Sequence, residues 1–167
     1  MNSAIPTGKE NHATIVKNML PQEREFILYL PLYDGIDKLE IGIDPGAEIV
    51  ASELNSPDRE NPIVMYGTSI LQGASASRPG MAATNIIGRR FDREVVNLGF
   101  SANAFLDKEI AELMSEVEAS AYVLDFVPNA SVSQIKELTI PFYRILRKKH
   151  RTTPIMFCLL YTSDAAD

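Results

Sequence analysis

The sequence predicts an α/β fold in which helices cover both faces of a parallel β-sheet, giving three layers. Two observations support this prediction. From Pro62 onward, short apolar segments alternate with longer segments of helical character, which is the order of elements in βαβ units. The apolar segments are also continuous rather than alternating with polar residues, as expected of strands that are buried on both faces.

Four apolar runs are predicted to be the strands of this sheet. They are rich in β-branched and aromatic residues, which favour strands in segments this short. Each is followed by a loop of small or polar residues. The predicted strands cover residues 63–67, 94–99, 121–127 and 153–160.

Two helices are predicted between the first three strands. Residues 79–91 form the first, because Pro79 suits the opening turn of a helix, although its apolar residues give no clean stripe. Residues 106–118 form the second, and their apolar positions have the spacing of one helix face. The residues expected on that face are Ile110, Leu113, Met114 and Val117.

A third helix is predicted over residues 131–150. Ser131 or Ser133 is the expected N-cap, since serine hydroxyls accept hydrogen bonds from the first free N–H groups of a helix. The last turn is basic, which suits the negative end of the helix dipole. Pro141 lies inside this segment and is expected to bend or interrupt the helix.

Residues 1–58 have a different pattern. Two short apolar segments, 26–30 and 39–43, flank a turn signal at Asp34 and Gly35, which predicts a β-hairpin. An isolated hairpin is marginal in water, so this β-rich segment should belong to an all-β module or lie on the body of the following domain. The polar, proline-bearing stretch that follows it reads as a linker.

Composition excludes several classes of function. The chain of 167 residues has a net charge of −6 and a pI of about 5.0, which argues against nucleic acid or an anionic membrane as its partner. No apolar run approaches the ~20 residues that span a bilayer, and the N-terminus lacks the layout of a secretory signal. The single cysteine, Cys158, is expected to be a small buried hydrophobe.

Candidate site residues follow the predicted strands, because ligands of open parallel sheets bind beyond the carboxyl ends of the strands. Ser69 follows the first strand, Ala102 the second and Asn129 the third. A serine hydroxyl on a tight turn can be a nucleophile, and two or three fixed N–H donors can stabilise an oxyanion. The donors would be the N–H groups of Ser69 and Ala102 and the amide of Asn129. Alternatively, Ser69 is an ordinary turn residue and Asn129 caps the next helix.

Three stretches carry a resemblance to a known family. "YGTSILQG", "NLGFSANA" and "LDFVPNAS" resemble the first three blocks of the SGNH (GDSL-like) hydrolases over residues 62–160. The resemblance implies a flavodoxin-like three-layer fold, with Ser69 as nucleophile, Ala102 at the second-block glycine and Asn129 as the third-block asparagine. It implies ester hydrolysis without a metal or organic cofactor, on a small-molecule ester or a carbohydrate (glycan) ester.

The resemblance is closest to a branch with an N-terminal β-sandwich domain. It implies that residues 1–58 are the last part of that domain plus a linker, and that residues 59–160 are an incomplete hydrolase domain. Residues 161–167 are expected to be a non-native tail. Beyond Leu160, the extended reading frame is expected to encode the Asp-x-x-His motif that this family uses and that this chain lacks.

The sequence also departs from the family pattern. Thr68 replaces the usual acidic residue before the serine, and Ala102 replaces glycine, where a positive φ would be strained by the added Cβ. His12 and His150 are the only histidines, and His150 is expected at the edge of the sheet opposite the site. A serine without a base is a poor nucleophile, so the chain by itself is expected to be nearly inactive.

Two other functions compete with ester hydrolysis. The loop after the first strand could hold FMN or another anion in a flavodoxin-like binding module, with Phe100 and Phe126 as the only evident flavin-stacking residues. The chain lacks the usual glycine-rich phosphate-binding patterns. The other alternative is a non-catalytic relative that binds acylated glycans.

Overall fold

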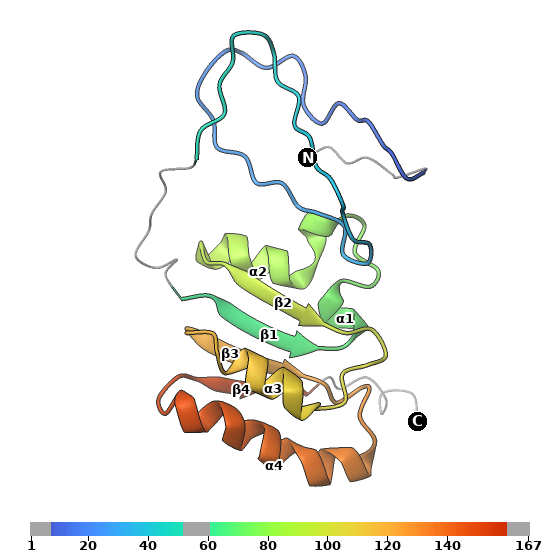
Figure 1. Ribbon diagram of the computed structural model, residues 1–167, viewed down its shortest axis with the longest axis vertical. Coiled ribbons are helices and arrows are strands. Elements are labelled where there is room, and N and C mark those ends of the chain that lie inside the picture. Colours follow the sequence, from blue (N-terminus) through green and yellow to red (C-terminus); the bar gives the residue numbers. More distant parts are fainter. Residues whose placement is uncertain (1–7, 52–60, 160–167) are drawn as a thin grey trace.

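A computed structural model of the chain describes residues 8–51 and 61–159 (Figure 1). The second of these ranges forms a four-stranded parallel sheet in the order β2-β1-β3-β4. All four predicted strands are present, which confirms the predicted α/β class. Their bounds are β1 Ile63–Gly67, β2 Val95–Gly99, β3 Ala121–Asp125 and β4 Ile155–Phe157.

The helices lie on both faces of the sheet. The connection from β1 to β2 contains α2 (Ala83–Phe91), and the one from β2 to β3 contains α3 (Lys108–Met114). These two connections step across the sheet in opposite directions, so right-handed crossovers place α2 and α3 on opposite faces. Helix α4 (Val132–Lys149) joins β3 to β4 and packs beside α3 (Figure 1).

The main core lies between the sheet and the pair α3 and α4. Strand residues at alternate positions point into it, as the pleat of a strand requires. Helix α3 contributes Ala111 and Met114, and helix α4 contributes Phe142 and Leu146. The strand side chains that they cover are Val64, Tyr66, Tyr122 and Leu124.

Helix α3 buries most of the predicted face but not Leu113. Leu113 is 65% exposed, while Ala111 and Met114 are fully buried, so the assignment of Leu113 to the core was wrong. The stripe that faces the core contains Ile110, Ala111 and Met114. Met114 is four residues from Ile110 and three from Ala111, so the three lie on one helix face. A small alanine lets the helix approach the sheet closely, and the leucine on the flank of the stripe stays in solvent.

Helix α4 has the predicted start but no interruption. Ser131 is its N-cap, accepting from the Gln134 N–H at 3.3 Å, and the Gln134 side chain accepts from the Ser131 N–H at 2.9 Å. This is a capping box. Pro141 lies inside α4 without breaking it. Both Pro141 and Glu137 are exposed, so water can satisfy the Glu137 carbonyl that proline leaves without a donor.

Two short helices between β1 and α2 differ from the elements that the sequence predicts there. Helix α1 (Ser69–Gln72) follows β1 directly and was not predicted. The predicted helix over 79–91 is divided into the 3-10 helix η2 (Pro79–Met81) and α2. The division occurs at Ala82, whose ψ of 144° is not helical.

The N-terminal segment, residues 8–51, contains no helix or strand, so the hairpin predicted over 26–30 and 39–43 was wrong as a prediction for this chain. A hairpin needs further strands or a packing surface to be stable, and the apolar side chains here, such as Phe26, are largely exposed. Part of the segment lies on the body beside α1 and α2 (Figure 1). Its place at the end of a β-sandwich domain stays a prediction, and most of the predicted linker and all of the predicted tail lie outside the described residues.

Candidate active site

The carboxyl ends of three neighbouring strands are level. Gly67, the last residue of β1, is in register with Gly99 of β2 and with Asp125 of β3. The loops that follow these strands therefore leave the sheet along one edge. Ser69 follows β1 as the first residue of α1, whereas Ala102 lies in the loop after β2 and Asn129 in the loop after β3. This arrangement is what the sequence predicts, although the roles of the three residues stay predictions.

Ser69 is the first residue of α1. The preceding residue, Thr68, is the N-cap, and its hydroxyl accepts from the Ile70 N–H at 3.3 Å. The Thr68 N–H donates to the Asp125 carbonyl at 3.1 Å, which ties the turn to the end of β3. Thr68 is buried and Ser69 is partly exposed. The turn therefore holds the backbone inside and presents the serine at the rim.

Two glycines allow close contacts at the carboxyl ends of β1 and β2. A Cβ atom at Gly67 would be 2.6 Å from the Asp125 carbonyl oxygen, and one at Gly99 would overlap the Gln72 backbone nitrogen. Neither position has space for any side chain. Gly67 thus lets the end of β3 lie close beside the end of β1, and Gly99 lets α1 lie directly on the end of β2.

Ala102 has a left-handed backbone. Its φ is +59°, so the strain expected from a Cβ at this position is present, costing about 1 kcal/mol. The loop is fixed on both sides of Ala102. The Ser101 N–H donates to Gln72 Oε1 at 2.9 Å, and the Leu106 N–H donates to the buried Tyr66 hydroxyl at 2.8 Å. The surrounding hydrogen bonds thus hold the alanine in a conformation that glycine would adopt more readily.

Asn129 does not cap α4, because Ser131 has that place. The Asn129 N–H donates to the Phe126 carbonyl at 3.0 Å, which closes the turn after β3. Its side-chain Oδ1 is buried and has no partner among the described residues. Within the described residues, no side-chain hydrogen bond therefore explains an asparagine at this position.

Asp125 is a buried carboxyl group at the end of β3. It is 5% exposed, and its Oδ1 has no hydrogen-bond partner in the described part of the chain. Burial raises the pKa of this carboxyl, and a hydrogen bond from the Cys158 thiol partly offsets the increase. Cys158, expected to be a small buried hydrophobe, is only half-buried.

Neither histidine contacts Ser69. His150 is buried at the opposite edge of the sheet, where its Nε2 lies 2.9 Å from the Ser115 carbonyl before β3 begins, which confirms its predicted location. His12 is an exposed residue of the N-terminal segment, 3.2 Å from Glu10. The described residues thus provide Ser69 with no imidazole base.

Two phenylalanines and two arginines have defined surroundings in the structure. Phe126 belongs to the core, and Phe100 packs against that core with its ring centroid 6.1 Å from the ring centroid of Tyr66. Arg89 donates to the Tyr29 hydroxyl at 2.9 Å. Arg78 is partly buried at the N-cap of η2, where its side chain makes no capping hydrogen bond.

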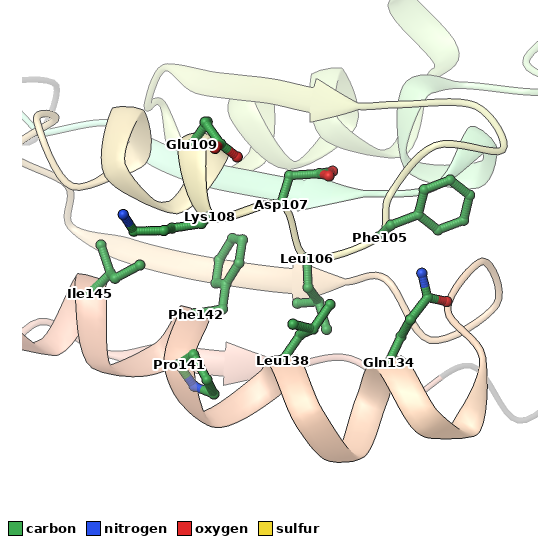
Figure 2. A pocket seen from close by; sticks show the side chains of 10 residues that line it. All are labelled: Phe105, Leu106, Asp107, Lys108, Glu109, Gln134, Leu138, Pro141, Phe142 and Ile145. Carbon is green, nitrogen blue, oxygen red and sulfur yellow. The ribbon is translucent and has the colours of Figure 1, made fainter.

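One cavity is lined by Phe105, Leu106 and Asp107, at the end of the loop that carries Ala102. It is a groove of about 670 Å³ between α3 and α4 (Figure 2). Its lining includes Leu106, Leu138, Phe142 and Ile145 but none of Ser69, Ala102 and Asn129. Within residues 8–51 and 61–159, no cluster of three or more His, Cys, Asp or Glu side chains could bind a metal. The described helices include none with the length and hydropathy of a membrane span.

Comparisons with known proteins agree with the fold. A model of the GDSL-like lipase/acylhydrolase family matches residues 60–165, and a model of the N-terminus of SGNH-hydrolase-type esterases matches residues 1–49. The crystal structure of a candidate GDSL-like lipase from Bacteroides ovatus ATCC 8483 is 45% identical, with a TM-score of 0.72. The alignment covers 77% of this chain and 37% of that protein. A search of curated proteins found no match.

Two more distant structures also match part of the chain. The salicylyl-acyltransferase SsfX3, from a tetracycline biosynthetic pathway, is 22% identical over 57% of this chain and 29% of its own length, with a TM-score of 0.49. AlinE4, an SGNH-hydrolase family esterase, is 11% identical over 58% of this chain and 57% of its own length, with a TM-score of 0.45.

Proposed function

The chain belongs to the GDSL-like lipase/acylhydrolase family, and on this premise we propose that Ser69 is the nucleophile of a serine ester hydrolase. The Ser69 hydroxyl would attack the ester carbonyl carbon and form a tetrahedral intermediate. That intermediate would lose the alcohol to give an acyl-serine, which water would then hydrolyse.

Three free hydrogen donors are the observation that carries this proposal. The N–H groups of Ser69 and Ala102 and the Asn129 side-chain NH₂ donate to no group among the described residues. All three belong to segments that leave one edge of the sheet. An oxyanion that develops beside Ser69 needs such fixed donors, and each is worth about 3 kcal/mol of transition-state stabilisation.

The proposed reaction also needs a general base. Neither His12 nor His150 contacts Ser69, and a serine hydroxyl is weakly nucleophilic without a base. The chain spans 37% of the length of the Bacteroides ovatus protein. We therefore place the base, an Asp-x-x-His histidine by the family pattern, in protein beyond the residues that the structure describes. The substrate that we propose is an acyl ester of a small molecule or carbohydrate.

A fluorophosphonate probe tests the proposal on the protein encoded by the complete reading frame. Mass spectrometry should locate the phosphonyl group on Ser69, and Ser69→Ala should abolish both labelling and the hydrolysis of p-nitrophenyl acetate. Ser101→Ala, which changes a neighbouring loop serine, is the matched control and should still be labelled. Labelling of another residue, or none on the complete protein, would refute the assignment of Ser69.

A further inference from the structure

We propose that Gln72 and Tyr33 are positioning residues, through which the N-terminal segment at residues 32–33 sets the placement of α1 relative to the loop that carries Ala102. The inference deepens the proposed function, on which its catalytic consequence rests. Its structural content, a mechanical link between two parts of the chain, can be tested without turnover.

Gln72 bridges the two parts directly. It is the last residue of α1, and both ends of its side-chain amide are used. Its Nε2 donates to the Leu32 carbonyl at 3.0 Å, and its Oε1 accepts from the Ser101 N–H at 2.9 Å. One side chain therefore connects the N-terminal segment to the residue before Ala102.

Tyr33 provides a second contact at the other end of α1. Its hydroxyl donates to the Ser69 carbonyl at 3.1 Å. Leu32 lies so close to Gly73 that a Cβ atom there would overlap the Leu32 side chain. Residues 32 and 33 thus contact both the first residue of α1 and the residue that ends it.

A helix as short as α1 depends on such external contacts. Four residues cannot form a stable helix by themselves, because nucleation is unfavourable and few internal hydrogen bonds follow it. On the sheet side, the Asn97 amide donates to the Leu71 carbonyl at 3.1 Å. On the opposite side, the described contacts of α1 include those of Leu32 and Tyr33.

Apart from the close contact of Leu32 with Gly73, the N-terminal segment contacts α1 mainly through hydrogen bonds. A cavity of about 230 Å³ lies between this segment and the body, lined by Pro31, Leu32, Gln72, Asn97 and Gly99. A loosely packed contact contributes little dispersion energy. Loss of one hydrogen bond should therefore loosen α1 and, through Gln72, the backbone at Ser101.

Amide hydrogen exchange on the full chain tests this link. Gln72→Met removes both hydrogen bonds and should speed exchange of the Ser101 N–H about fivefold, the effect of one typical hydrogen bond. Gln72→Glu keeps an acceptor for Ser101 and should keep exchange there within about twofold of wild type. Tyr33→Phe should speed exchange at Gln72 and Gly73, and also at Ser101 if the link transmits the change.

Matched controls separate the link from a general loss of stability. Gln134→Met removes a glutamine from the capping box of α4, and Tyr143→Phe removes a hydroxyl that accepts from Arg147. Neither should change exchange at Ser101 beyond what its free energy of unfolding explains. Unchanged Ser101 exchange in Gln72→Met, or in Tyr33→Phe, would overturn the proposal.

The catalytic consequence has its own readout on the complete protein. Gln72→Met and Tyr33→Phe should lower the maximal rate of Ser69 phosphonylation about fivefold while the concentration for half-maximal rate stays constant, and Gln72→Glu should recover part of the loss. Failure of wild type to be labelled would refute the proposed function and leave the exchange result standing. Wild-type labelling with no change in the variants would overturn the positioning role alone.

Discussion

The sheet region and the N-terminal segment contain similar apolar runs but have different structures. In the run 63–67 every residue joins a parallel sheet, and Val64 and Tyr66 are fully buried. In the run 26–30 no strand forms, and Phe26 and Ile27 are mostly exposed. The difference shows that an apolar run specifies a strand only where the chain also provides partner strands and a helix to cover them.

The largest expected effect comes from a phenylalanine pair that contrasts the two regions. Phe142→Ala removes a side chain that is 1% exposed in the α4 core, and it should lower the free energy of unfolding by about 3–5 kcal/mol. Phe26→Ala removes one that is 64% exposed and should change it by less than about 0.5 kcal/mol. Urea denaturation followed by far-UV circular dichroism measures both. Similar losses in the two variants would mean that the N-terminal segment has a packed core of its own.

A glycine pair gives the next largest effect. At Gly99 a Cβ atom would overlap the backbone of Gln72, so Gly99→Ala should displace α1 and lower the free energy of unfolding by about 1–3 kcal/mol. At Gly42 an added Cβ meets nothing within 4 Å, so Gly42→Ala should be neutral or stabilise by up to about 1 kcal/mol. Urea denaturation again gives the comparison, with Ser69 labelling as a second readout on the complete protein. Normal stability of Gly99→Ala would contradict the close contact of α1 with β2.

The sequence could predict the strands but not every contact of the site. The runs beginning at Ile63 and Ala121 are continuous and apolar, and this property is local enough to identify buried strands. Helix α1 has only four residues, too few for a helical period, so Ser69 could be located at a strand end but not at a helix start. The role of Gln72 depends on Leu32, which is 40 residues away, and no spacing rule reports such a contact.

The N-terminal prediction failed for a related reason. The turn signal at Asp34 and the flanking apolar residues describe a local preference, and the structure has no neighbouring strands over residues 8–51 to support it. The error at Leu113 is smaller in scale. Periodicity located the correct helix but did not show which flank of its apolar stripe faces the sheet. Ala111 is a weak sequence signal of burial, yet its side chain is fully buried in the structure.

An alanine pair should give a smaller effect of opposite sign in the two regions. Ala102 has φ +59°, so Ala102→Gly should relieve strain and stabilise the fold by up to about 1 kcal/mol. Ala47 has no positive φ, and Ala47→Gly should only add freedom to the unfolded chain, destabilising by about 0.4–1 kcal/mol. Thermal denaturation measures the sign. A loss of stability in Ala102→Gly would mean that the methyl group of Ala102 makes a contact that outweighs its backbone strain.

The smallest effect concerns the buried carboxyl of Asp125, whose increase in pKa is partly offset by the Cys158 thiol. An acid whose pKa is raised on folding binds its proton more tightly in the folded state. Its contribution to stability is therefore present below the ordinary pKa of 3.8 and is lost as the pH rises through the folded pKa. Asp125→Asn cannot ionise and should flatten this decline in the free energy of unfolding, measured by urea denaturation across that pH range. Asp34→Asn, at an exposed carboxyl of the N-terminal segment, is the matched control, and equal flattening in the two variants would mean that burial of Asp125 does not control its protonation.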